Sequence, residues 1–309
     1  MNTKPILIVG GEPNSVFSEI FVKSIKYKKF KSPIILIMSL DLLIKQTLIF
    51  NKKNLNIVEF RDLNKVIDNK KINIINIDHK NNPKIYIKKC FEIAFKILKK
   101  GITDKFINGP INKKKFLNNR YLGITEYISK KFNIENIAML IYNKDLSVSP
   151  ITTHLPLKSV TKNINKKEIF KKILLIHKFY KTKLKRDPKI AITGLNPHCE
   201  SIHKFNEDEK IIKPSVKKLK KKKINIKGPF SADTIFLKRN RNKFDVIVGM
   251  YHDQVLTPIK TLYEYDAINI TLGLPFTRIS PDHGPNETMV GMNTSNPTSL
   301  IRALEFLDN

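Results

Sequence analysis

The chain has 309 residues, 41% of them hydrophobic and 27% charged, which excludes a disordered protein and leaves room for one large α/β unit or for two lobes. Its two cysteines, Cys90 and Cys199, exclude a disulfide scaffold and a four-thiolate metal site, and no apolar run is long enough to span a bilayer. The formal net charge of +30 comes from 50 lysines and seven arginines. Because nucleic-acid-binding proteins favour Arg, solvated lysine faces explain this charge better than a polyanion partner does.

The predicted strands are short apolar runs that alternate with helices along the chain. The first run, residues 4–9, ends in Gly10-Gly11-Glu12-Pro13, a sequence that predicts a buried strand entering a loop. Later runs of similar length repeat this pattern. We expect strands at 4–9, 33–38, 72–77, 106–108, 137–142, 148–152, 189–193, 244–250 and 268–272.

The clearest predicted helix covers residues 83–100, because Pro83 suits the first turn, Gly101 ends the helix, and an apolar stripe runs between them. The lysine-rich run 217–223 has the spacing of the end of a surface helix. Strands and helices in alternation predict an α/β fold of mostly parallel sheets with helices on both faces. We expect helices at 83–100, 166–180, 208–222 and 297–307.

In such sheets, the residues that carry chemistry lie in the loops that follow the carboxyl ends of the strands. The polar residues that fit no periodic pattern gather at these places. The expected loop segments are 108–113, 152–157, 194–198, 251–254 and 269–284.

Three of the seven histidines, His154, His198 and His252, each follow directly on a predicted strand. A single histidine at such a place is more often structural, but parallel strand ends converge and could bring three imidazoles together. Three nitrogen ligands with an open position suit Zn²⁺ or another borderline divalent ion that acts as a Lewis acid. The lysine-rich or helical surroundings of His79, His177 and His203 predict structural or surface roles instead.

Five segments of the sequence closely resemble, in the same order, the signature segments of the 4-hydroxythreonine-4-phosphate dehydrogenase family. These segments are Thr152–Leu157, Gly194–His198, Gly228–Thr234, Tyr251–Gln254 and Asn269–Arg278. The resemblance implies a metal-dependent enzyme of pyridoxine (vitamin B6) biosynthesis. Such an enzyme oxidises 4-phosphooxy-threonine with NAD⁺ or NADP⁺, and the resulting β-keto acid loses CO₂ to give 3-amino-2-oxopropyl phosphate.

The same resemblance implies a two-lobed fold like that of isocitrate and isopropylmalate dehydrogenases, with the active site in a cleft between the lobes. We expect one lobe to comprise residues 1–122 and 285–309, and the other residues 123–284. The start of the chain, from Met1 to Gly10, lacks the features of a signal peptide, so we expect a cytoplasmic protein. We expect neither a nucleic-acid partner nor a membrane partner.

The resemblance also implies roles for individual residues. It makes His154, His198 and His252 the ligands of a divalent ion (Zn²⁺, Mg²⁺ or Co²⁺), contributed by both subunits of a homodimer that shares its active site. A metal at this place would lower the pKa of the substrate hydroxyl group. The residues that match the family's substrate contacts are Thr125, Lys260, Asn269 and Arg278.

Two further residues are candidates for catalysis. Asp253 could orient the neighbouring His252 or take a proton, although an exposed structural carboxylate is the alternative. Lys113, which follows the Gly109-Pro110 loop, is a candidate acid/base or phosphate partner.

Lys260 and Arg278 could neutralise the substrate carboxylate and phosphate, for which Arg has the better fork geometry.

The sequence departs from the family pattern at several positions. The family usually has His where this chain has Ile124, next to the substrate-binding Thr125, and Gly where this chain has Val255. The glycines that usually follow Gly-Glu-Pro are absent, and Pro285-Asn286-Glu287-Thr288 replaces small residues near the nucleotide. No nucleotide-binding residue can therefore be assigned.

Two alternatives stay open. One is a dehydrogenase of the same fold that acts on a non-phosphorylated hydroxy acid, which the missing imidazole at Ile124 would allow. The more remote one is a polyanion-binding protein that uses its basic surface without catalysis. Metal content and NADH formation distinguish the enzymes from the binding protein.

Overall fold

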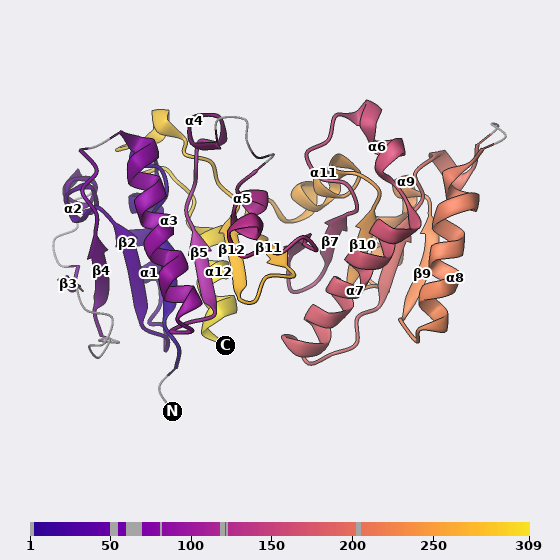
Figure 1. Cartoon of the computed structure of the whole chain (residues 1–309), viewed down its shortest axis with the longest axis horizontal. Coiled ribbons are helices and arrows are strands. Elements are labelled where there is room, and N and C mark those ends of the chain that lie inside the picture. Colours follow the sequence, from indigo (N-terminus) through magenta and orange to yellow (C-terminus); the bar gives the residue numbers. More distant parts are fainter. Residues whose placement is uncertain are drawn as a thin grey trace. The chain divides into compact units, whose positions relative to one another are not determined.

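The computed structural model describes residues 3–49, 55–59, 70–80, 82–117, 121, 123–201 and 205–309. They form two compact units, whose elements are labelled in Figure 1. Unit 1 comprises Met1–Ile128, Tyr265–Ile268 and Pro275–Asn309, and unit 2 comprises Ser129–Glu264 and Asn269–Leu274. His203 and the lobe boundary expected at residue 122 lie outside the described residues.

The sheet of unit 1 is parallel at every neighbouring pair of its strands. Its central strand β1 is completely buried, because helices cover both faces of a parallel sheet and a continuous apolar run suits such a strand. In spatial order its strands are β3 (Ile57–Glu59), β4 (Ile72–Asn76), β2 (Ile34–Met38), β1 (Ile6–Val9), β5 (Lys105–Asn108) and β12 (Thr277–Pro281).

Helices lie on both faces of this sheet, with α3 in front and α12 behind in Figure 1. The boundaries of α3 follow from its sequence, since Asn82 caps its first turn through Lys84 N and Pro83 is its first residue. The helical segments are α1 (Phe17–Tyr27), α2 (Leu40–Ile49), α3 (Pro83–Lys99), α4 (Lys113–Leu117), the 3₁₀ turn η3 (Glu287–Met289) and α12 (Thr298–Asp308).

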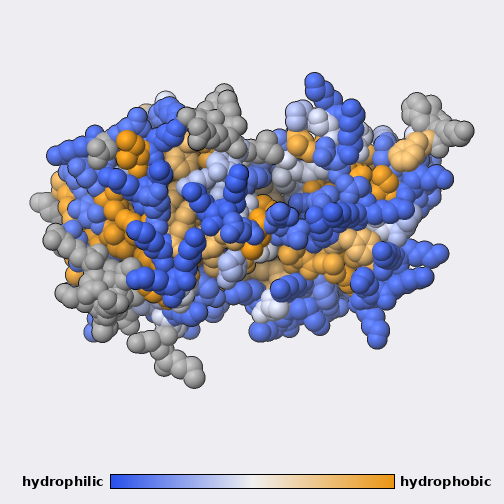
Figure 2. Space-filling view, viewed as in Figure 1, coloured by the Kyte–Doolittle hydropathy of each residue, from blue (hydrophilic) through white to orange (hydrophobic). Residues whose placement is uncertain are grey.

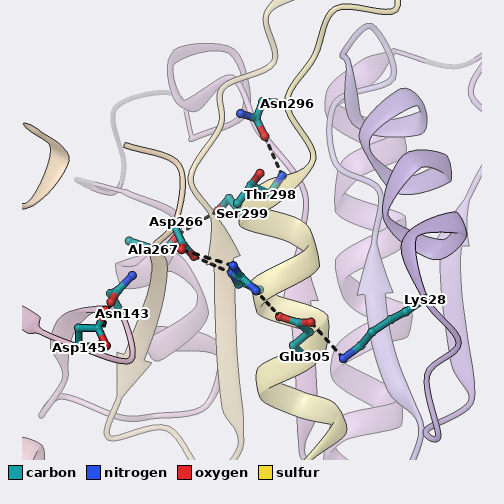
Figure 3. A network of polar contacts seen from close by, with 10 residues as sticks. Lys28, Asn143, Asp145, Asp266, Ala267, Asn296, Thr298, Ser299 and Glu305 are labelled. Atoms are coloured by element: carbon teal, nitrogen blue, oxygen red, sulfur yellow. Dashed lines mark hydrogen bonds and ion pairs between the residues drawn. The ribbon is translucent and has the colours of Figure 1, made fainter. Parts of the chain in front are cut away.

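A polar network fixes α12 within unit 1 (Figure 3). Arg302 donates to Asp266 at 2.6 Å and to Glu305 at 2.8 Å, and Lys28, at the end of α1, pairs with Glu305 at 3.0 Å. The hydroxyl of Ser299 donates to the carbonyl of Ala267. These contacts join the last helix of the chain to its first helix and to the segment before β11.

The sheet of unit 2 is mixed. Strands β7, β10, β8 and β9 are parallel to one another in that order, whereas β6 is antiparallel to β7. In spatial order its strands are residues 269–272 of β11 (Ile268–Leu272), β6 (Ala138–Tyr142), β7 (Ser147–Pro150), β10 (Val246–Gly249), β8 (Ile190–Thr193) and β9 (Ile226–Phe230).

The remaining helical segments begin with α5, which contains the last residues of the stretch Met1–Ile128 of unit 1 and the first residues of unit 2. The long helix α7 begins at its Asn165 cap, whose side chain accepts from Glu168 N. These segments are α5 (Ile124–Lys131), α6 (Leu157–Asn163), α7 (Lys166–Thr182), η1 (Pro197–Cys199), the π turn η2 (Asp208–Ile212), α8 (Lys213–Lys221), α9 (Ala232–Ile235), α10 (Lys238–Arg241) and α11 (His252–Tyr263).

The structure confirms each strand and helix expected from the sequence, with ends that shift by a few residues. It also shows two errors. The loop expected at 251–254 is the start of α11, and the loop expected at 269–284 contains strand β12. Both elements carry polar or helix-breaking residues, such as Pro258 within α11 and Arg278 within β12, that conceal the usual apolar pattern.

The surface is rich in hydrophilic residues, as the high lysine content of the sequence predicts. Hydrophilic residues cover most of the face seen in Figure 2, and the lysine run at the end of α8 is exposed apart from Leu219, as expected. Among the described residues, no helix is long and apolar enough to cross a membrane.

Candidate active site

The three histidines predicted as metal ligands follow three adjacent strands of unit 2. Strand β10 lies between β7 and β8 and is parallel to both, so their carboxyl ends share one edge of the sheet. His154 follows β7, His252 follows β10, and His198 follows β8. The sheet order therefore places the three loops side by side.

The structure brings two of these histidines together. The ring centres of His154 and His252 lie 5.8 Å apart, with their planes tilted by 40°. Nitrogen ligands lie ~2.0–2.1 Å from a zinc ion, so two rings at this separation suit one shared ion. The loop of His154 is held by Thr152, whose hydroxyl donates to the carbonyl of Met250 at 2.8 Å, just before His252.

Asp253 orients the ring of His252. Its Oδ1 lies 2.6 Å from Nδ1 of His252, and the carboxylate accepts, so in the neutral tautomer Nδ1 carries the hydrogen and Nε2 has the lone pair that a metal ligand needs. The Asp253 side chain itself is 79% exposed. This arrangement of imidazole and carboxylate is the one that metal-binding histidines commonly use.

His198 occupies the neighbouring loop, and within the part of the chain that the structure describes it does not complete a metal site. Among the described residues, no group of three or more His, Cys, Asp or Glu side chains is arranged to hold a metal ion. The donor set that is present, two imidazoles with one oriented by a carboxylate, fits a borderline divalent cation that still needs further ligands.

Gln254 connects the loops of His198 and His252. Its amide nitrogen donates to the carbonyl of Gly194 at 2.8 Å, and its Oε1 accepts from the hydroxyl of Thr193 and from Met250 N. The sequence places Gln254 in the motif 251–254 but predicts no role for it. Its position immediately after His252 and Asp253 was the one sign of a role in the site.

In unit 1, Arg278 and Thr125 are in direct contact. Arg278 is completely buried on β12, its Nε donates to Oδ1 of Asn108 at 2.7 Å, and its Nη1 donates to Oγ1 of Thr125 at 2.9 Å. Burial lowers the pKa of Arg278 to about 10, against the opposing effect of the nearby Glu126, so the guanidinium stays charged at neutral pH. Asn108 was not identified from the sequence, although it ends β5 at the start of an expected loop.

The other expected site residues occupy separate elements. Lys113 is the exposed first residue of α4. Lys260 is half-buried on α11, about two turns after His252, and burial lowers its pKa. Asn269 is partly buried on β11.

The loops after β1 and β5 pack closely against each other. Gly11 has φ +82°, and a Cβ there would lie 2.3 Å from the carbonyl oxygen of Pro110, so only glycine suits this approach. Glu12 accepts from Asn112 N at 3.1 Å and is buried, which raises its pKa. The Gly-Glu-Pro segment thus supports the loop that leads to Lys113.

The departures at Ile124 and Val255 are accommodated as apolar packing. Ile124 is buried at the start of α5, beside Thr125. Val255 is completely buried, and a Cβ on Gly249 would lie 2.5 Å from its Cγ1, so a small residue on β10 makes room for the larger one on α11.

Comparison with known proteins agrees with these features. Residues 29–307 match the family described as pyridoxal phosphate biosynthetic protein PdxA. A 4-hydroxythreonine-4-phosphate dehydrogenase of Sulfurihydrogenibium sp. is 36% identical over 97% of this chain and 96% of its own. A D-threonate 4-phosphate dehydrogenase of Pectobacterium atrosepticum is 33% identical over 71% of this chain and 68% of its own.

Solved structures show the same relationship. A 4-hydroxythreonine-4-phosphate dehydrogenase from Klebsiella pneumoniae superposes with a TM-score of 0.84 at 25% identity, covering 99% of this chain and 98% of its own. An isocitrate dehydrogenase from Methylococcus capsulatus, 10% identical, shares the fold with a TM-score of 0.53 over 97% of this chain and 84% of its own, as expected. The chain belongs to the pyridoxal phosphate biosynthetic protein PdxA family.

Proposed function

We propose that the chain is an NAD(P)⁺-dependent 4-hydroxythreonine-4-phosphate dehydrogenase that acts in pyridoxine biosynthesis. It oxidises the hydroxyl carbon of 4-phosphooxy-threonine, and the product then loses CO₂ to give 3-amino-2-oxopropyl phosphate. The observation that carries this proposal is the pairing of His154 and His252 at adjacent strand ends, with Asp253 orienting His252. The names of the related enzymes support the choice of substrate.

The histidines would hold a divalent ion, Zn²⁺, Mg²⁺ or Co²⁺, within a homodimer. His154 and His252 would provide two imidazole nitrogen donors in one chain, and His198 and a second copy of the chain would complete the set. A bound ion supplies Lewis acidity to the substrate hydroxyl. The tautomer that Asp253 imposes keeps Nε2 of His252 available as a ligand.

Thr125 and Arg278 would bind one anionic end of the substrate. Because Thr125 Oγ1 accepts from Arg278, its own hydroxyl hydrogen is directed to another acceptor, for which a phosphate oxygen is suited. The buried guanidinium adds positive charge behind this hydroxyl. Lys260 and Asn269 would contact the other polar groups of the substrate.

The reaction requires a hydride and a proton to leave the substrate carbinol. The hydride passes to the nicotinamide of NAD⁺ or NADP⁺, and the hydroxyl proton passes to a base. Cleavage of the carbon–carbon bond then releases CO₂ and leaves an enol that takes a proton at carbon. Lys113 and Asp253 are the candidates for these proton transfers.

The direct test is incubation of the full chain with 4-phosphooxy-threonine, a divalent metal and either NAD⁺ or NADP⁺. We expect formation of reduced cofactor and of 3-amino-2-oxopropyl phosphate, detected by absorbance and by mass spectrometry. Absence of both products with either cofactor would refute the proposed activity.

A second candidate substrate is D-threonate 4-phosphate, which the name of the Pectobacterium relative favours. A non-phosphorylated hydroxy acid is the other alternative, because Ile124 offers no hydrogen-bond donor to a phosphate. Comparison of kcat/KM for 4-phosphooxy-threonine, D-threonate 4-phosphate and free 4-hydroxythreonine ranks the three. The Ile124→His variant should lower KM for the phosphorylated substrates only, since an imidazole can donate to phosphate.

A further inference from the structure

The loop that carries His198 has an unusual backbone conformation. His198 and the following Cys199 both have positive φ, 55° and 62°, in the left-handed region that non-glycine residues rarely adopt. Two such residues in succession persist only where the surrounding structure holds them. The hydrogen bonds Cys199 N to Asn196 O and Glu200 N to Pro197 O close the turn locally.

The buried carboxylate of Asp208 holds the start of this loop. Asp208 is completely buried, and its Oδ1 accepts from Leu195 N at 2.8 Å. Its Oδ2 accepts from Asn196 N at 3.2 Å and from the side-chain amide of Asn196 at 2.9 Å. One carboxylate thus fixes the two residues that precede Pro197 and His198.

The surroundings of Asp208 are built for this contact. Asp208 is the first residue of the π turn η2, a rare form that is frequent at functional sites, and its own N–H is bound by Oδ1 of Asn206 at 2.9 Å. A Cβ on Gly194 would lie 2.6 Å from Oδ1 of Asp208, so the absence of a side chain there lets the carboxylate approach.

We propose that Asp208 is a positioning residue that sets the conformation of the His198 loop and thereby the affinity of the site for its divalent ion. This inference rests on the proposed metal-dependent function. Residues that orient metal ligands through hydrogen bonds typically change metal affinity 10–100-fold when they are replaced. Asp208 is not itself a metal ligand. It acts indirectly, by holding the backbone of Leu195 and Asn196.

Asp245, which directly precedes β10, provides a matched control at the other end of β8. Its carboxylate accepts from Lys189 N at 2.7 Å and from Arg186 at 2.8 Å, at the amino end of β8, whereas Asp208 acts beyond the carboxyl end of β8. Both aspartates accept from backbone N–H groups next to β8, so Asp208→Asn and Asp245→Asn each replace one of two acceptor oxygens with an amide donor, at opposite ends of one strand.

The experiment is a titration of the metal-free, full-length protein with Co²⁺, followed by the visible absorption of the bound ion. We expect Asp208→Asn to bind Co²⁺ about 10–100-fold more weakly than the wild type and to change its absorption spectrum. Asp245→Asn should keep the wild-type affinity and spectrum, although both variants lose thermal stability.

Other outcomes separate the two proposals. Wild-type affinity in Asp208→Asn, or an equal loss in both variants, would overturn the role of Asp208 while leaving the metal site intact. A wild-type protein that binds no Co²⁺ would instead overturn the metal site, and the inference with it. If Asp208→Asn does not fold, Asn196→Ala removes one of the three bonds to Asp208, together with the bond from Asn196 to Glu207, and unchanged Co²⁺ affinity in that variant would refute the inference.

Discussion

A completely buried guanidinium needs acceptors for its N–H groups, and Arg278 finds them in Asn108 and Thr125. The acceptors come from the end of β5 and the start of α5, so the side chain ties together two segments far apart in sequence from its own strand. Individual motifs do not reveal this contact. The sequence predicted Thr125 and Arg278 as site residues, but their pairing, and the part of Asn108, depend on the β5–β12 register.

Replacement of Arg278 by Lys keeps the charge but not the planar fork that reaches both Asn108 and Thr125. We expect Arg278→Lys to lower kcat/KM for 4-phosphooxy-threonine by roughly 10- to 100-fold, the scale of a charge-assisted hydrogen bond. Steady-state kinetics measure this change, with Arg239→Lys on the exposed surface of α10 as the control. Equal kinetics in the wild type and Arg278→Lys would show that the fork has no role in binding.

His283 gives the stability of the protein a pH dependence of known sign. Burial lowers its pKa to about 4, against a weak opposing bond to the carbonyl of Gly284, and among the described residues its Nε2 has no hydrogen-bond partner. The unfolded chain has a pKa near ~6.5 for this group, so it binds the proton first as pH falls. Stability should therefore decrease from about pH 6.5 to pH 4, by up to about 3 kcal/mol from this group.

Chemical denaturation of the wild type and of His283→Gln at several pH values measures this contribution. The variant should lose less stability across that range, because glutamine does not titrate, while the carboxylates contribute equally to both proteins. Parallel curves for the two proteins would contradict the lowered pKa of His283.

At the scale of secondary structure, the pattern of apolar residues correctly predicted elements whose apolar side chains are buried in the core. Strand β1 and helix α3 are such elements, and their ends follow from Gly10 and Pro83. Patterning failed at α11 and β12, whose chemistry-bearing residues, His252 and Arg278 among them, replace the apolar signal. The two segments that were wrongly expected to be loops thus both carry residues of the candidate site.

The network around α12 predicts a modest, salt-dependent contribution to stability. Arg302 pairs with Asp266 and Glu305 at once, but its side chain is 42% exposed, so solvent screens the interaction. We expect Arg302→Met to lower the free energy of unfolding by about 0.5–1 kcal/mol at low salt, and by less at high salt. Thermal unfolding at two ionic strengths measures the effect, and a loss that does not depend on salt would contradict an electrostatic origin.

At the scale of the whole molecule, the sequence motifs predicted three ligands, and one chain brings two of them together. His198 is held in its own loop, and the homodimer proposed above would supply the remaining contacts. Apart from the family resemblance, the order of the motifs along one chain does not show whether a second copy contributes ligands.

Mixing of inactive variants tests whether the site is shared between subunits. If His154 and His252 of one chain act with His198 of the other, a mixture of His198→Ala and His252→Ala chains contains heterodimers with one intact site. At most about a quarter of the wild-type activity should return after subunit exchange, because half of the dimers are mixed and each has one intact site. No recovery, after exchange is verified by native mass spectrometry, would contradict this division of the ligands between the chains.

The dependence of turnover on metal tests the proposed metal-dependent reaction most directly. The full-length protein, freed of metal by a chelator, is titrated with Zn²⁺ or Co²⁺ while reduced cofactor formed from 4-phosphooxy-threonine is measured together with bound metal. We predict that activity is absent without metal and rises in proportion to the bound ion, and that His252→Ala neither binds the ion nor gains activity. Full turnover by the metal-free protein would contradict a metal-dependent reaction.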